Sequence, residues 1–161
     1  MKTALITGAA RGIGLATTKQ FLEAGWRVIM VDRDEAALED AAAPLDDTLS
    51  IVADVSDKDQ VATLAAAHTK IDALINNAGV ADFGPIEETD FTRWRNVMET
   101  NLDGVFLMTQ AFTAALATTQ GSIVNIASIS GLRASTLRVA YGTSKAGVIA
   151  LTQQQAVELG E

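Results

Sequence analysis

Short runs of β-branched and other apolar residues alternate along the chain with longer segments rich in Ala, Leu, Glu and Gln. The short runs predict five strands, each nearly continuous in apolar residues, as expected for strands covered on both faces. Their expected ranges are Thr3–Thr7, Arg27–Asp32, Leu49–Ala53, Ala73–Asn76 and Ser122–Ala127. Strands that alternate with helical segments are typical of βαβ units around a parallel sheet.

The longer segments predict helices between the strands and after the last one. The expected ranges are Gly12–Ala24, Asp34–Ala43, Lys58–His68, Thr89–Thr118 with a break, and Val139–Leu159. Pro44 ends the second helix because proline disfavours the α conformation of the residue before it. We therefore expect an α/β fold, with a doubly wound parallel sheet between two layers of helices, in one domain over residues 1–161.

Composition narrows the class of protein. Of the 161 residues, 48% are hydrophobic, which is enough for one compact domain. The 12 basic and 20 acidic residues give a net charge of −8, which argues against binding to nucleic-acid phosphate or anionic membrane. No apolar run approaches the ~20 residues of a membrane span, and Gly8 ends the first run before the length of a secretion signal. A soluble protein is expected.

The chain has no cysteine and a single histidine, His68. A protein without cysteine has no disulfides and no thiolate metal site, and it fits a reducing compartment, so we expect a cytoplasmic location. A histidine metal site or a Ser-His-Asp triad would rest on His68 alone, and a solvated helix position is the commoner role for such a residue. We predict no metal site.

A glycine-rich turn, Thr-Gly-Ala-Ala-Arg-Gly-Ile-Gly over residues 7–14, joins the first strand to the first helix. Glycine lets the backbone approach a pyrophosphate, which the N–H groups and positive end of the helix attract. The spacing departs from the standard dinucleotide fingerprint, because Gly12 lies four residues after Gly8 and Thr17 lies three after Gly14. A strand-to-helix turn without a ligand is the alternative interpretation.

Asp32 closes the second strand, 18 residues after Gly14. This is close to the ~20-residue offset at which an acidic residue binds the adenine ribose of NAD. The alternative is that Asp32 caps the next helix. A carboxylate here would repel a 2′-phosphate and so favours NAD, while Arg11 and Arg33 are near enough in sequence to leave NADP possible.

Tyr141 and Lys145 lie four residues apart on a predicted helix, so their Cβ atoms should be about 5–6 Å apart on one face. A phenol begins with a pKa near ~10, and a neighbouring ammonium favours its ionised form. Tyr141 is therefore a candidate general acid or base. A solvated helix face is the alternative for an isolated Tyr and Lys pair.

Five features in order resemble the short-chain dehydrogenase/reductase family. They are the turn at 7–14, Asp32, Asp54-Val55, Asn-Asn-Ala-Gly at 76–79, and Ser128 with Tyr141-x-x-x-Lys145. The resemblance covers essentially the whole chain and includes Asn101, where the family carries its fourth catalytic residue. It implies a Rossmann-like fold and an oxidoreductase that transfers hydride between NAD, or NADP, and a small alcohol or carbonyl compound.

The resemblance also implies a role for each matching residue. Tyr141 would exchange a proton with the substrate oxygen, and Lys145 would assist it and bind the nicotinamide ribose. Ser128 would donate to the carbonyl oxygen, and Asn101 would anchor a water relay. Asp54 and Val55 would border the adenine. The full set of expected cofactor-binding residues is Gly8, Arg11, Gly12, Ile13, Gly14, Asp32, Asp54, Val55, Asn77, Ala78, Gly79, Tyr141 and Lys145.

The chain departs from the family pattern at its end. Family members continue through further strands, whereas this chain ends at Glu161, so we expect a truncated sheet whose fifth strand is an edge. The missing segment carries most of the substrate pocket, which leaves the substrate open. The alternatives to an active oxidoreductase are a non-catalytic dinucleotide-binding module and an inactive fragment of such an enzyme.

Two helical segments, Asn101–Thr118 and Val139–Leu159, suggest self-association as a homodimer or homotetramer. In the resembled family they form interfaces, and apolar or small residues cover more than one face of the first segment. Those residues are Leu102, Val105, Phe106, Thr109, Phe112, Ala115 and Leu116, with Val148, Leu151 and Ala156 on the second segment. Ordinary packing of one face onto the sheet is the alternative.

Overall fold

The computed structural model describes residues 1–160, which divide into two compact units. Unit 1 comprises Met1–Ala78 and Leu107–Val124, and unit 2 comprises Gly79–Phe106 and the chain from Asn125 onward. The single domain expected over residues 1–161 stays a prediction.

A five-stranded parallel sheet with the order β3-β2-β1-β4-β5 organises unit 1. The strands are β1 (Thr3–Thr7), β2 (Arg27–Asp32), β3 (Thr48–Val52), β4 (Ala73–Asn76) and β5 (Ser122–Asn125). Leu5 of β1 pairs with Ile29 of β2 and with Leu74 of β4, so β1 is central. The order confirms the doubly wound α/β fold and places β5 at an edge, as expected from the sequence.

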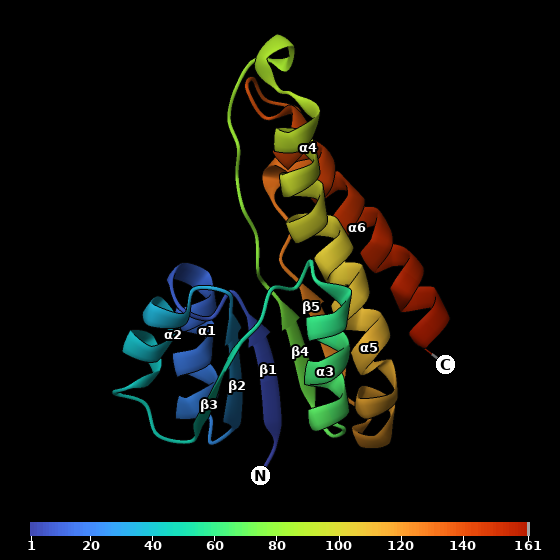
Figure 1. Ribbon diagram of the computed structural model, residues 1–161. Helices are drawn as coiled ribbons and strands as arrows, with labels where there is room; N and C mark the ends of the chain where they lie inside the picture. The colour runs from blue at the N-terminus through green and yellow to red at the C-terminus, as the bar shows by residue number, and fades with distance from the viewer. Residues whose placement is uncertain (161) are drawn as a thin grey trace. The chain divides into compact units, whose positions relative to one another are not determined.

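Helices cover both faces of this sheet (Figure 1). They are α1 (Gly12–Glu23), α2 (Glu35–Ala42), α3 (Lys58–Ala67) and α5 (Gly104–Thr119), of which unit 1 holds the part from Leu107 onward. Helices α1 and α2 contact β1, β2 and β3. On the other face, Val61 of α3 and Phe112 of α5 join Leu5 in one buried cluster. Burial on both faces explains why β1 is apolar at nearly every position.

Most of the apolar positions that suggested self-association are buried within the chain. Phe112, Ala115 and Leu116 belong to the core of unit 1, and Val105, Thr109 and Val148 are also buried. Phe106 remains exposed. Packing within the chain therefore accounts for much of the pattern, and the homo-oligomer stays a prediction that rests on fewer residues.

Helices also build unit 2. It contains short 3₁₀ turns at Ile86–Glu88 (η1) and Ile129–Gly131 (η3), α4 (Phe91–Met98), a π-helical stretch at Glu99–Asp103 (η2), and α6 (Val139–Leu159). Helix α4 packs beside α6 in Figure 1, and α6 also contacts η2 and η3. The break expected within Thr89–Thr118 is confirmed, because α4 ends at Met98 and α5 begins at Gly104. The chain between them is π-helical over Glu99–Asp103.

Residues 1–160 contain neither a candidate membrane span nor a candidate metal cluster. None of the helices there combines the length and apolar character needed to cross a membrane. Within the same range, no cluster of three or more His, Cys, Asp or Glu side chains is arranged to hold a metal ion.

Candidate functional site

The glycine-rich turn of unit 1 is closely packed where β1 meets α1. Gly8 has φ +63°, and a Cβ added there would lie 2.9 Å from the Cα atom of Ala78. A Cβ on the buried Gly14 would lie only 2.1 Å from the carbonyl oxygen of Gly8. Gly12 has φ +55° and open space around its Cβ position. The turn thus needs glycine for packing at two positions and leaves open space at the third.

Asn77 and Thr7 brace this turn from within unit 1. The Asn77 amide Nδ2 donates to the carbonyl oxygens of Thr7 at 2.9 Å and Gly8 at 3.1 Å. The Thr7 hydroxyl accepts from the backbone N–H groups of Asn77 and Ala78, both at 3.0 Å. The side chain of Asn77, expected to line a cofactor cleft, therefore fixes the turn.

The N-terminus of α1 has no side-chain cap, since Arg11 occupies the cap position without a side-chain bond to the helix. Asp34, Asp57 and Asp90 cap α2, α3 and α4 in contrast. The first N–H groups of a helix have no partner within it, and together with the helix dipole they attract anions. Gly12 and Gly14 have no side chain at two positions of the first turn of α1, so the backbone there can approach a phosphate.

Asp32 lies half-buried at the end of β2, beside the same turn. Its Oδ2 accepts from the backbone N–H of Ala10 at 3.1 Å, and its Oδ1 accepts from the N–H of Asp34 at 3.1 Å. Asp34, and not Asp32, caps α2 through the N–H of Ala37 at 3.2 Å. The alternative role of Asp32 as the helix cap is therefore wrong, and its carboxylate is fixed beside the glycine-rich turn.

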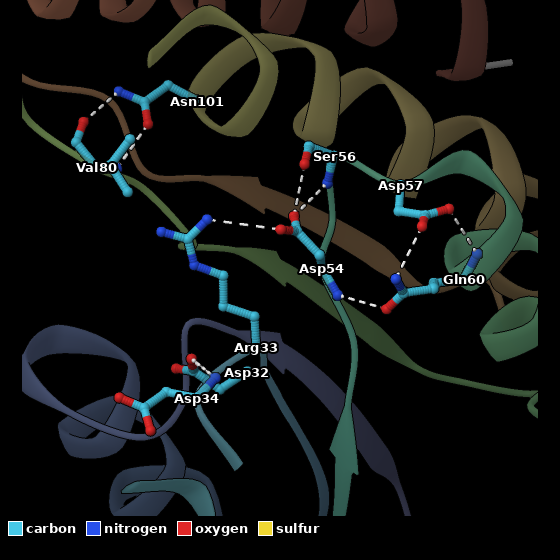
Figure 2. Close-up of polar contacts among 9 residues, drawn as sticks. All are labelled: Asp32, Arg33, Asp34, Asp54, Ser56, Asp57, Gln60, Val80 and Asn101. Carbon is cyan, nitrogen blue, oxygen red and sulfur yellow. Dashed lines mark hydrogen bonds and ion pairs between the residues drawn. The ribbon is translucent and has the colours of Figure 1, made fainter. Parts of the chain in front are cut away.

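Both arginines that left NADP possible are paired with carboxylates. Arg11 forms an ion pair with Asp34, and Arg33 Nη1 lies 3.5 Å from Asp54 Oδ2, as Figure 2 shows for the second pair. Burial acts to raise the pKa of Asp54, but hydrogen bonds from Ser56 and the Arg33 charge together hold that pKa below its usual value. Asp54 is therefore ionised at neutral pH.

The remaining expected cofactor residues differ in exposure. Val55 is buried in the core of unit 1, and Ala78 packs against the same core. Ile13 is 63% exposed, an unusual position for a large apolar side chain, and it lies in the first turn of α1. Gly79 is exposed and belongs to unit 2. The structure thus gathers Gly8, Gly12, Gly14, Asp32 and Asn77 around one turn and leaves the side chain of Val55 away from solvent.

Asn101 is fully buried in the π-helical stretch of unit 2. Its Oδ1 accepts from the N–H of Val80 at 2.8 Å, and its Nδ2 donates to the Val80 carbonyl at 2.9 Å, a paired contact visible in Figure 2. Nδ2 also donates to the Ser144 hydroxyl at 3.0 Å. The side chain therefore joins the segment that follows β4 to the helix that carries Tyr141.

Ser128 and Lys145 lie on two segments of unit 2 that pack closely. The Ser128 hydroxyl accepts from the N–H of Ser130 at 3.1 Å and caps η3. A Cβ on Gly131 would lie 2.6 Å from the carbonyl carbon of Lys145, so glycine is needed where η3 meets α6. This contact explains how a serine thirteen residues before Tyr141 is held against the same helix.

Lys145 is a buried cation, with only 4% of its surface exposed. Its Nζ donates to the carbonyl of Ile126 at 2.7 Å and lies 5.9 Å from the centre of the Tyr141 ring. The ring of Tyr141 also meets the ring of Phe83 edge to face, with centroids 6.3 Å apart. A positive charge at this distance stabilises negative charge that develops on the phenol oxygen. In unit 2, α6 thus carries Tyr141 and Lys145 and is contacted by Asn101 through Ser144 and by the 3₁₀ turn η3 that Ser128 caps.

Burial lowers the pKa of Lys145 below its usual value. The folded chain then binds this proton less tightly than the unfolded chain, so stability rises as the pH climbs from the folded pKa towards the unfolded value of ~10.4. As the pH rises towards the unfolded pKa, the free energy of unfolding of the wild type should therefore rise relative to that of Lys145→Met. Urea unfolding at several pH values measures this. Lys19→Met, which removes an exposed lysine of α1, is the control, and parallel curves for wild type and Lys145→Met would contradict the prediction.

Three side chains of this region were not among the residues expected from the sequence. Ser144 accepts from Asn101 and donates to the carbonyl of Tyr141 at 2.8 Å, so it links the two. Phe83 contacts the Tyr141 ring, and the Arg138 guanidinium lies 6.0 Å from the same ring. Ser144 and Arg138 are within three residues of Tyr141 in the sequence, which was a usable signal. Nothing in the local sequence marked Phe83.

Known proteins are similar to this chain over nearly its whole length. The family model of short chain dehydrogenases matches residues 2–161. Galactitol 2-dehydrogenase (L-tagatose-forming) of Cereibacter sphaeroides is 40% identical over 96% of this chain and 64% of its own length. NAD-dependent glycerol dehydrogenase of Listeria innocua is 39% identical over 98% of this chain and 64% of its own length.

A solved structure is similar over nearly the whole chain. The crystal structure of a short-chain dehydrogenase from Streptomyces avermitilis has a TM-score of 0.93 and 32% identity, and the match covers 99% of this chain and 62% of that one. The chain therefore spans a little under two thirds of the length of these relatives. Because the family model covers almost every residue, this chain belongs to the short chain dehydrogenase family.

Proposed function

We propose that this chain acts in hydride transfer between a nicotinamide cofactor and a small alcohol or carbonyl compound. The observation that carries the proposal is the buried Lys145, whose ammonium lies 5.9 Å from the ring of Tyr141. Burying a cation is unfavourable, and such groups concentrate at functional sites. The names of the two curated relatives, a galactitol and a glycerol dehydrogenase, support an alcohol or carbonyl substrate class.

In this proposal the turn of unit 1 holds the pyrophosphate of the cofactor. The open space at Gly12 and the uncapped N-terminus of α1 fit a phosphate, and Asp32 is fixed next to the turn where a ribose hydroxyl can donate to it. The cofactor supplies the hydride chemistry. The expected adenine contacts at Asp54 and Val55 and the contacts of Asn77, Ala78 and Gly79 remain part of the same proposal.

The residues of unit 2 carry the proton chemistry. Tyr141 gives a proton to the substrate oxygen during reduction and takes it back during oxidation. Lys145 stabilises the negative charge on the phenol oxygen, and Ser128 donates a hydrogen bond to the substrate oxygen, where charge develops. Asn101 positions α6 through Ser144, and its contact with Val80 fixes the π-helical stretch. In the resembled family the same side chain anchors a water relay.

NAD is the cofactor that the charges of unit 1 favour. Asp32 and Asp54 are carboxylates, and the two nearby arginines are ion-paired with Asp34 and Asp54. A 2′-phosphate would have to displace these pairs or lie among carboxylates, which is unfavourable. NADP remains the second candidate.

Asp32→Asn is expected to raise the affinity for NADPH relative to NADH about tenfold, because it removes a negative charge and keeps a side-chain acceptor for Ala10. Fluorescence titration with each cofactor measures the ratio. Asp40→Asn, on the exposed part of α2, removes the same charge elsewhere and should leave the ratio unchanged. An unchanged ratio in Asp32→Asn would move the selectivity to another residue.

The main rival is a dinucleotide-binding module without catalysis. Titration with NADH and turnover of a panel of carbonyl compounds separate the two. Binding with turnover supports the oxidoreductase, and binding without turnover supports the module. No binding at millimolar NADH would contradict both and leave an inactive fragment. We also propose that the chain assembles as a homodimer or homotetramer and that it is located in the cytoplasm. Light scattering at micromolar protein concentration tests the assembly.

A further inference from the structure

Unit 2 contains a cavity of about 430 Å³ next to the helix that carries Tyr141. Seven of its lining residues lie between Ser128 and Tyr141 in the sequence, and the eighth is Phe83. Two guanidinium groups, Arg133 and Arg138, line the cavity together with serine and threonine hydroxyls, and no carboxylate lines it. The volume is within the range of sites that take small molecules.

Arg138 is held in place without an ion pair. Its Nη1 donates to the buried Ser130 hydroxyl at 3.2 Å, and its guanidinium carbon lies 4.9 Å from the centre of the Phe83 ring. Within residues 1–160, no carboxylate lies within ion-pair distance of Arg138 or Arg133. A guanidinium carries five N–H donors, so Arg138 keeps most of its hydrogen-bonding capacity.

The other two arginines of unit 2 are both neutralised. Arg93 forms an ion pair with Asp82, whose Oδ2 accepts from the Arg93 Nε at 2.7 Å, and Arg95 pairs with Glu99 and Asp103. Asp82 is the acidic residue next to Phe83, and this pairing commits its carboxylate to Arg93. Although the chain has a net charge of −8, the two arginines of unit 2 without an ion pair among residues 1–160 both line this cavity.

We propose that this cavity binds an anionic group of the substrate, a carboxylate or a phosphate, through the guanidinium of Arg138 with Arg133 adding charge at the rim. A planar guanidinium binds either group through two parallel hydrogen bonds. Arg138 lies 6.0 Å from the ring of Tyr141, so a small molecule bound here by its anion presents a nearby carbonyl to the phenol. The inference rests on the proposed function and narrows its substrates to oxo acids, oxo phosphates and the corresponding alcohols.

The test is an NMR titration of the whole chain with three carbonyl probes. The probes are 4-oxopentanoate, dihydroxyacetone phosphate and the neutral methyl ester of 4-oxopentanoate. At least one of the two anions should bind about tenfold more tightly than the ester, and Arg138→Gln should remove that advantage. Arg27→Gln is the matched control, because it removes an exposed arginine of β2 that has no ion pair among residues 1–160. This variant should still bind the anion more tightly than the ester. Arg138→Lys retains the positive charge and should keep part of the tighter binding of the anions.

Each outcome has a defined meaning. Tighter binding of the acid or of the phosphate identifies which anion the cavity prefers. Equal binding of the ester and both anions, no binding of either anion, or an equal loss in Arg27→Gln and Arg138→Gln would overturn the inference. A separate titration with NADH distinguishes this failure from that of the proposed function, because cofactor binding with no preference for anions contradicts the inference alone. Anion binding through Arg138 without NADH binding would contradict the proposed function alone.

Discussion

Replacement of Tyr141 by Phe is expected to lower carbonyl reduction about a thousandfold and to leave the affinity for NADH within a few fold. The change removes only the phenol oxygen. The edge-to-face contact with Phe83 and the neighbouring Arg138 and Lys145 involve the ring, which phenylalanine retains. The loss should therefore appear in the rate of the chemical step and not in the folding of α6.

Single-turnover oxidation of NADH by a carbonyl substrate measures the rate, and NADH fluorescence measures the affinity. Thr143→Val is the matched control, since it removes an exposed hydroxyl two residues away on the same helix. Its rate should equal that of the wild type. If Tyr141→Phe reduces the substrate as fast as the control, Tyr141 is not the proton donor, and the proposed mechanism has no general acid.

The strands show how far hydrophobic patterning can predict the fold. The expected ranges of β1, β2 and β4 agree with the structure residue by residue. These strands are covered on both faces, so their apolar runs begin and end with the strand. The edge strands differ: β3 lies one residue earlier than expected, and β5 ends at Asn125, two residues before the expected end. An edge strand has one neighbour and is partly exposed, so its hydrogen bonding fixes its ends less strictly than its composition suggests.

The helix over Thr89–Thr118 shows what patterning misses. The sequence predicted a break in this segment but not its position, and the structure has a π-helical stretch at Glu99–Asp103 between α4 and α5. π-type hydrogen bonding is rare and is frequent at functional sites. The side chain of Asn101 leaves this stretch to bind Val80, twenty-one residues away in the sequence. Local periodicity carries no information about such a partner.

In the candidate site too, the sequence predicts local features but not contacts with distant segments. Residue type and spacing made Tyr141, Lys145 and the glycine-rich turn candidates, because the chemistry expected of them depends on neighbours along one helix or one turn. The partners of those residues come from distant segments, as Phe83 does for Tyr141 and Asn77 does for Gly8. Charge pairing was equally hidden, since the sequence did not say that Arg33 would meet Asp54. Folding supplies these contacts, and they distinguish paired arginines from the unpaired ones at the cavity.

The glycine-rich turn gives the largest expected effect on stability. Gly14→Ala should lower the free energy of unfolding by about 3 kcal/mol or more, because the added methyl group would lie 2.1 Å from the carbonyl oxygen of Gly8. Both ends of this contact are backbone, so relief requires α1 to move away from β1. The affinity for NADH should fall as well, since the N-terminus of α1 would shift from the position that fits a phosphate.

Gly25→Ala separates this steric effect from the general cost of replacing glycine. Gly25 follows α1 with φ +77°, and nothing lies within 4 Å of its Cβ position. An alanine there meets only the unfavourable left-handed backbone, which costs about 1–2 kcal/mol. Urea unfolding of both variants should show the larger loss for Gly14→Ala, with NADH affinity lowered in that variant alone. Equal losses would mean that α1 yields freely at Gly14, and that close packing against Gly8 does not determine how the turn receives a phosphate.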